Sequence, residues 1–212
     1  LEEAGLDHLI IMEFTLDFAR TTSEKFVEDY LVGKLHAFTI VVGFNHYFGH
    51  NREGNYNSLY KARERFSFQV EEIPEQEIQN ETVSSTRIRK ALKEGNIQRA
   101  NAYLDFYYLI CTTLELLPEQ SAEPGFSCFR ISVNDPLKLM PPAGNYAASF
   151  FLRDQKQKAL VHRGEKGLLL YPLDPEAVPG TGKQTIRFHL RLSGPGEPDL
   201  SLMLKAIREL IY

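Results

Sequence analysis

The sequence has little of what secreted and membrane-spanning proteins depend on. It contains two cysteines, Cys111 and Cys128, and no tryptophan. Two cysteines give neither a disulfide framework nor the ligand spacing of a metal site. No run of the chain approaches the roughly 18 apolar residues of a membrane-spanning helix, and no basic-then-apolar leader indicates secretion. These absences predict a cytoplasmic protein that works in a reducing setting without a membrane partner.

An excess of positive charge is also missing. The chain carries 24 Lys and Arg against 28 Asp and Glu, a net charge of −4, which excludes a nucleic-acid partner held by bulk electrostatics. It does have 43% hydrophobic residues, with 14 Phe and 10 Tyr among its 212 residues. That composition is enough for real cores, and the length suits two domains of about 100 residues each.

The first half of the sequence has the pattern of an α/β protein. Continuous apolar runs at residues 8–12 and 37–42 predict strands buried on both faces of a parallel sheet. Between them, Thr21 and Glu24 have the spacing of a capping box, which predicts a helix to about residue 35. The three segments would form a right-handed βαβ unit. Polar and aromatic residues at 44–54 then follow the end of the second strand, where open α/β sheets bind ligands.

Residues 83–89, Val-Ser-Ser-Thr-Arg-Ile-Arg, are the strongest local signal for a ligand. They follow a helix predicted at 56–66 and a strand at 67–72, and they begin a helix predicted at 85–94, with a further helix at 97–104. Three hydroxyls at a helix start can accept from free N–H groups, and the same place favours an anion. Two arginines add fork-shaped donors suited to phosphate oxygens. A well-capped surface helix with solvated arginines would share this pattern, so both interpretations stay open here.

The second half changes to short strands separated by Pro and Gly clusters. Six strands with no helix between them predict a small antiparallel β-barrel or sandwich, and a last helix begins near Asp199. The predicted fold class is therefore α/β plus all-β, with domains at residues 1–104 and 105–212. The strands are expected at residues 107–115, 128–133, 145–152, 158–162, 168–171 and 185–192.

In this order the motifs resemble the bacterial bifunctional riboflavin kinase/FMN adenylyltransferases, also called FAD synthetases. The segments that carry the resemblance are residues 14–27, 42–49, 83–89 and 91–101. It implies a partial Rossmann-like nucleotidyltransferase domain, followed by a six-stranded antiparallel riboflavin kinase-like barrel with a C-terminal helix. It further implies small-molecule substrates only, and adenylyl transfer from ATP to FMN that gives FAD and pyrophosphate, with Mg²⁺ expected. A monomer is favoured.

The resemblance also implies roles for two groups of residues. ATP phosphates would be held by Ser84, Ser85, Thr86, Arg87 and Arg89. The flavin or its phosphate would be bordered by Asn45, Phe48, Gly49 and Arg52. No residue is predicted to bind a metal, because His46 and His50 sit in a loop without a third candidate.

Two departures from the family pattern matter. The His-x-Gly-His segment that stabilises the transition state in this family is absent, so no residue is assigned a catalytic role. We expect that segment upstream of Leu1 in the natural protein, and this chain alone is expected to be inactive. In the barrel, residues 125–130 read Gly-Phe-Ser-Cys-Phe-Arg, where active kinases read Gly-Phe-Pro-Thr-Ala-Asn. Cys128 and Arg130 replace the Thr and Asn of the magnesium–nucleotide site, and Arg187 replaces the glutamate expected as general base.

The sequence therefore predicts an FMN adenylyltransferase joined to a degenerate riboflavin kinase-like barrel that retains a structural or flavin-binding role. A non-catalytic flavin- or nucleotide-binding paralogue is the alternative, and a fully bifunctional enzyme that also takes riboflavin is a further one. Smaller questions also stay open. The two cysteines could form a disulfide or be buried free thiols, His162 and His189 are expected to be packing or surface residues, and the Tyr107–Tyr108 and Phe150–Phe151 pairs are expected in the core.

Overall fold

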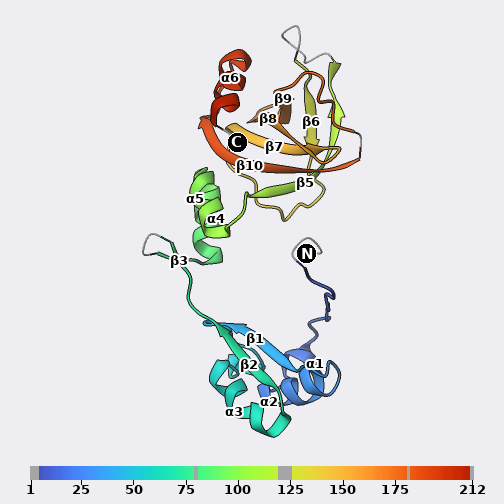
Figure 1. Ribbon diagram of the computed structural model, residues 1–212, viewed down its shortest axis with the longest axis vertical. Helices are drawn as coiled ribbons and strands as arrows, with labels where there is room; N and C mark the ends of the chain where they lie inside the picture. Colours follow the sequence, from blue (N-terminus) through green and yellow to red (C-terminus); the bar gives the residue numbers. More distant parts are fainter. Residues whose placement is uncertain (1–4, 79–80, 119–125, 181, 211–212) are drawn as a thin grey trace. The chain divides into compact units, whose positions relative to one another are not determined.

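The computed structural model describes residues 5–78, 81–118, 126–180 and 182–210. It divides into two compact units, Leu1–Gln76 and Glu77–Tyr212 (Figure 1). Gly125, the first residue of the altered kinase segment, lies outside the described residues. The domain boundary at residue 104 rests on the sequence and stays a prediction.

The first unit is built on two parallel strands, β1 (Thr39–Gly43) and β2 (Gln69–Ile73), joined through a short 3₁₀ turn, η3 (His50–Arg52), and helix α3 (Tyr56–Phe66). Helix α3 was predicted at these residues, and its start is fixed by Asn55, whose side chain accepts from the Ser58 N–H while the Ser58 hydroxyl accepts from the Asn55 N–H. The core of the first unit contains Val27, Val42, Leu59 and Phe68.

The prediction of a strand at residues 8–12 is wrong. This segment has no strand conformation, and Leu9, Ile10 and Ile11 are exposed. A strand needs a neighbour to satisfy its N–H and C=O groups. Within the described part of this unit, the only strand pairing is that of β1 with β2. The parallel βαβ unit is therefore β1–α3–β2 rather than the one predicted from residues 8–42.

The helix predicted to begin at a Thr21–Glu24 capping box starts one residue later and is not a regular α-helix. After α1 (Leu16–Ala19), α2 (Ser23–Lys25) continues into a π-helical stretch, η2 (Phe26–Val32). Thr22 is the N-cap and accepts from the Lys25 N–H at 3.3 Å. With Thr22 as the N-cap, the third residue of the helix is Lys25 rather than Glu24, so no capping box forms, and the Glu24 carboxylate pairs with Arg65 of α3 instead.

The second unit begins with a short antiparallel pair, β3 (Glu77–Ile78) and β4 (Glu81–Thr82), followed by α4 (Ser85–Glu94) and α5 (Ile97–Leu104). Both helices lie where they were predicted. Gly95 ends α4 in a left-handed conformation (φ 76°), which glycine adopts without steric cost. Leu92 of α4 and Ile97 of α5 are buried in the same core as the barrel interior.

Six antiparallel strands then close into a barrel in the order β10–β5–β6–β9–β8–β7. The prediction of a six-stranded antiparallel barrel is confirmed, with strand ends shifted by up to three residues. The strands are β5 (Leu109–Leu116), β6 (Phe129–Ser132), β7 (Gly144–Leu152), β8 (Gln155–Gly164), β9 (Gly167–Pro172) and β10 (Lys183–Ser193).

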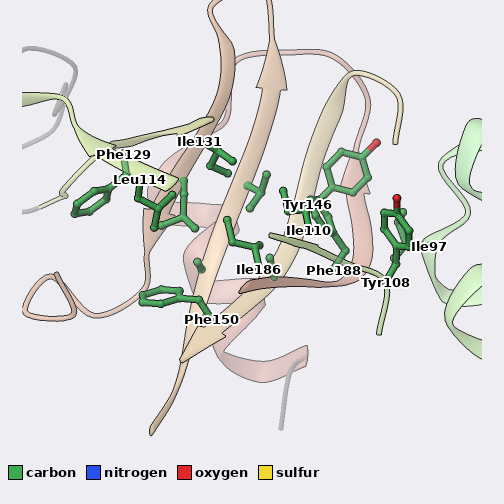
Figure 2. Packing of buried hydrophobic residues seen from close by; sticks show 14 of the residues in the cluster. Ile97, Tyr108, Ile110, Leu114, Phe129, Ile131, Tyr146, Phe150, Ile186 and Phe188 are labelled. Carbon is green, nitrogen blue, oxygen red and sulfur yellow. The ribbon is translucent and has the colours of Figure 1, made fainter. Parts of the chain in front are cut away.

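Alternation along the strands fills the barrel with apolar side chains. Tyr146, Phe150, Ile186 and Phe188 lie in one buried cluster (Figure 2). The residue between two such positions, Arg187, is half-exposed, as the two-residue period of a strand requires.

The predicted C-terminal helix is confirmed as α6 (Leu200–Leu210). Its buried residues Leu200, Leu204 and Ile207 form a second cluster with Leu160 and Tyr171. Among the described residues, no helix is both long and apolar enough to cross a bilayer.

Candidate functional site

The first unit contains a largely apolar cavity of about 480 Å³. Three of the four residues predicted to border a flavin, Phe48, Gly49 and Arg52, line it together. The remaining lining residues are mostly apolar and come from residues 10–26 and from the loop after β1: Ile10, Met12, Phe14, Phe18, Ala19, Thr21, Phe26 and Tyr47.

Aromatic rings build the wall of this cavity. Phe18 meets Tyr30 and Phe26 edge-on, with ring centroids 5.5 and 6.2 Å apart. Phe26 in turn lies 5.9 Å from Phe48, and His46 stacks on Phe48 at the same centroid distance. The cavity is therefore walled by a set of rings that extends into η2.

The loop that carries the predicted flavin residues is closed by a tight backbone bridge. Phe48 and Gly54 exchange both of their N–H···O bonds, at 3.0 and 2.9 Å. Gly49 has φ 74° and ψ 175°, and a Cβ there would lie 2.6 Å from the Ser23 backbone nitrogen. Only glycine fits that conformation at that distance. The bridge and the close approach fix Phe48 and Arg52 relative to the start of α2.

Arg52 is the one cation that lines the described part of this cavity. Its guanidinium carbon lies 5.0 Å from the centre of the Tyr47 ring, a distance at which the ring stabilises the cation. Asn45, the fourth predicted flavin residue, lies in an exposed turn and is not among the residues that line the cavity.

The two histidines of this loop have other partners. His50 Nδ1 lies 3.1 Å from the Ala19 carbonyl oxygen, and His46 stacks on Phe48. In the ranges that the structure covers, no three His, Cys, Asp or Glu side chains gather as a metal site would require.

The second candidate region is the start of α4. Ser84 is the N-cap, and its hydroxyl oxygen accepts from the Arg87 N–H at 3.3 Å. Ser85 and Thr86 are exposed, whereas Leu92 is buried and Ile88 packs against the same core. The apolar side of the helix thus anchors it, and its first turn presents hydroxyls and backbone N–H groups to solvent.

The two arginines of the motif differ in their surroundings. Arg87 Nη1 lies 3.0 Å from Glu81 Oε2, and the same carboxylate also accepts from Arg99 and from the Tyr103 hydroxyl. Hydrogen bonds from Tyr103 and Arg99 lower the pKa of Glu81 to about 2. For Arg89, by contrast, the described part of the chain provides no ion pair. This network gave no recognisable sequence signal, because Arg87, Arg99 and Tyr103 follow Glu81 by 6, 18 and 22 positions.

The three altered kinase positions all lie in the barrel unit. Cys128 is fully buried, and burial raises the pKa of its thiol. Arg130 pairs with Glu115 across the β5–β6 ladder at 3.4 Å. The Arg187 guanidinium lies 4.9 Å from the centre of the Phe151 ring. None of the three presents a carboxylate or a hydroxyl.

Both cysteines are free, and Cys111 is exposed rather than buried. The strand register rules out a disulfide between them. Cys128 lies opposite Leu117, whose N–H donates to the Cys128 carbonyl, and Leu117 is six residues along the strand direction from Cys111. Each aromatic pair is split, with Tyr108 and Phe150 buried and their neighbours Tyr107 and Phe151 exposed.

His162 and His189 are packing residues, as predicted. His162 Nδ1 lies 2.8 Å from Asn145 Oδ1, and His189 Nε2 lies 2.9 Å from the Ser149 hydroxyl. Burial lowers the pKa of both rings, that of His189 to about 4.

Comparison with known proteins bears on the first unit most directly. The family model of FAD synthetase matches residues 1–87. The predicted resemblance to the FAD synthetases is confirmed. A bifunctional riboflavin kinase/FMN adenylyltransferase from Listeria monocytogenes is 31% identical over 150 residues, 71% of this chain and 47% of the relative. An FAD synthetase from the same species is 34% identical over 111 residues, 52% of this chain and 45% of the relative. The chain thus spans less than half the length of these curated relatives.

A solved structure supports the fold over nearly the whole chain. The crystal structure titled macrolide-efflux protein from Streptococcus pneumoniae matches with a TM-score of 0.79 and covers 99% of this chain and 71% of that one. At 22% sequence identity, this likeness supports the fold alone.

Proposed function

We propose that this chain is part of an FMN adenylyltransferase, which transfers an adenylyl group from MgATP to FMN and gives FAD and pyrophosphate. The observation that carries the proposal is the cavity of about 480 Å³ lined by Phe48, Gly49 and Arg52. Three residues that the family resemblance assigns to the flavin line one cavity, and its other walls are mostly apolar.

The chemistry of the cavity suits a flavin. An isoalloxazine ring is flat and aromatic, and aromatic side chains such as Phe26, Phe48 and Tyr47 offer it stacked or edge-on contacts. The volume lies within the range of small-molecule sites. Arg52 supplies one permanent positive charge beside these rings, where it can pair with the phosphate of FMN.

The nucleotide would be held at the start of α4. Ser84, Ser85 and Thr86 bring hydroxyls to a turn whose first N–H groups have no helical partner, and Arg89 adds a cation on that helix. Arg87 was predicted to contact the phosphates as well, but its guanidinium pairs with Glu81, which supports a positioning role for Arg87. Magnesium would arrive as part of the MgATP substrate, coordinated by phosphate oxygens and water.

Adenylyl transfer asks the protein for positioning and charge neutralisation. A phosphate oxygen of FMN attacks the α-phosphorus of ATP, and the bond from that phosphorus to the pyrophosphate breaks. The cavity would orient FMN, and the first turn of α4 with Arg89 would neutralise charge on the phosphates.

We further propose that the barrel does not phosphorylate riboflavin. A general base must accept a proton from the flavin hydroxyl, and the Arg187 guanidinium has donors only. The Cys128 thiol and the Arg130 guanidinium carry no oxygen, so neither side chain offers the oxygen ligands that magnesium prefers. Cys128 is also buried, and Arg130 is paired with Glu115.

Flavin binding to this chain tests the first part of the proposal. FMN fluorescence quenching should give a dissociation constant that rises at least tenfold in Arg52→Ala. The matched control is Arg63→Ala, which also removes an arginine that lies over a tyrosine ring, Tyr60 at 3.6 Å, but one that does not line the cavity. Equal FMN affinity in both variants would contradict the assignment of the cavity.

A further inference from the structure

Glu81 is the centre of an ion cluster that joins three elements of the second unit. Its Oε2 atom lies 3.0 Å from Arg87 Nη1 of α4 and 2.5 Å from Arg99 Nη2 of α5. The Tyr103 hydroxyl donates to the same oxygen, and Arg99 Nε donates to the Tyr103 oxygen at 2.8 Å. Glu81 itself lies in β4, which ends one residue before Val83 of the predicted phosphate motif.

The anchor of this cluster is on α5. Tyr103 is 7% exposed and belongs to the buried core, whereas Arg87 and Arg99 are 44% and 47% exposed. Two donors from α5 therefore fix the carboxylate, and Arg87 reaches it with one terminal nitrogen. Because Glu81 precedes the motif and Arg87 lies inside it, the cluster clamps residues 83–86 from both ends.

The cluster and the exposed Ser85 hydroxyl lie on different faces of α4. Arg87, Lys90, Ala91 and Glu94 line a cavity of about 390 Å³ together with Glu81, Arg99 and Tyr103. Residues two apart on an α-helix point about 200° apart, whereas residues four apart share a face. Arg89 is thus on the side of Ser85, and Arg87 faces α5.

We propose that Glu81 and Arg87 are positioning residues that hold residues 83–86 in the conformation that receives the nucleotide phosphates, while Arg89 and the hydroxyls make the contacts. This inference rests on the proposed function. Its physical basis is pre-organisation, because a turn that is already ordered does not lose that conformational freedom when the nucleotide binds. The low pKa of Glu81, about 2, keeps its carboxylate charged at every pH at which the enzyme would be assayed.

The test is steady-state kinetics on the complete gene product, with KM measured separately for MgATP and for FMN. Glu81→Gln and Arg87→Met should each raise KM for MgATP about three- to tenfold and leave KM for FMN unchanged. Because both residues act through one clamp, the double variant should be no worse than either single variant. Tyr103→Phe, which removes only the hydroxyl that anchors Glu81, should show part of the same effect.

Glu94→Gln is the matched control. It removes one carboxylate from the same cavity, but its partner is Lys90, four residues earlier at 3.9 Å, so KM for MgATP should not rise. If net charge alone mattered, Glu81→Gln and Glu94→Gln would both lower KM for MgATP.

Two results would overturn the inference while leaving the proposed function standing. One is a lower or unchanged KM for MgATP in Glu81→Gln. The other is a rise in KM for MgATP that is far larger in Arg87→Met than in Glu81→Gln and that adds to it in the double variant. A direct phosphate ligand would show that pattern. A wild-type protein that does not use MgATP at all would instead refute the proposed function and this inference with it.

Discussion

Replacement of Gly49 by alanine tests whether the loop after β1 is held as the cavity requires. Gly49 has φ 74° and ψ 175°, a region that is essentially restricted to glycine and costs other residues about 1–3 kcal/mol. The new Cβ would also lie 2.6 Å from both Ser23 N and Ser23 Cα, and such overpacking costs roughly 1–3 kcal/mol. We therefore expect Gly49→Ala to destabilise the first unit by about 2–6 kcal/mol, or to shift Phe48 and Arg52.

The assay has two readouts, thermal unfolding and FMN binding. For a unit of this size we expect a fall in Tm of about 8 °C or more, and FMN affinity should fall at least tenfold. Gly43→Ala is the control without either cost, since nothing lies within 4 Å of its Cβ and its φ is not positive. Gly5→Ala is a second control that carries the cost of a positive φ alone, because Gly5 has φ 75° and nothing lies within 4 Å of its Cβ. A Gly49→Ala protein with unchanged Tm and FMN affinity would refute the reasoning.

Three further predictions concern the barrel. Phe150→Ala should lower the free energy of unfolding by about 3–5 kcal/mol, because Phe150 is fully buried. Phe151→Ala should lower it by about 1 kcal/mol or less. Equal losses for the two variants in denaturant titrations would contradict the inward–outward alternation. Burial, together with the positive charges of Lys156 and Arg187, lowers the pKa of His189 to about 4. As pH falls, the unfolded state therefore binds a proton before the folded state does, and stability should fall between about pH 6.5 and 4. His189→Gln should reduce that slope, and an unchanged slope would exclude His189 as its source. The single change Arg187→Glu should not create riboflavin kinase activity, since Cys128 remains; FMN formed from riboflavin by this variant would show that Arg187 alone blocks the reaction.

Local patterns predicted the barrel and the helices α3, α4 and α5 well. Caps and periodicity lie within a few residues of each other in the sequence, so α3, α4 and α5 appear where they were expected. Short strands bounded by Pro and Gly clusters likewise predicted six strands, because each strand is marked by its own turn residues.

Features that depend on distant partners were missed. Residues 8–12 have the composition of a buried strand, yet a strand exists only beside a neighbour. Thr21 and Glu24 have capping-box spacing, but Glu24 pairs with Arg65, 41 residues away. No local pattern assigned the apolar cavity wall from Ile10 to Phe26 to a ligand, and none joined Glu81 to Arg87. The sequence therefore predicted three of the residues that line the cavity and none of the residues that hold Arg87.

The most direct test of the central claim is product analysis on the protein as translated from its gene. It should be incubated with MgATP and either FMN or riboflavin, and the flavins should then be separated chromatographically. The account predicts FAD from FMN and no FMN from riboflavin. Flavin that binds but is never adenylylated would contradict it in favour of a non-catalytic paralogue, and FMN formed from riboflavin would contradict the assignment of the barrel as an inactive kinase.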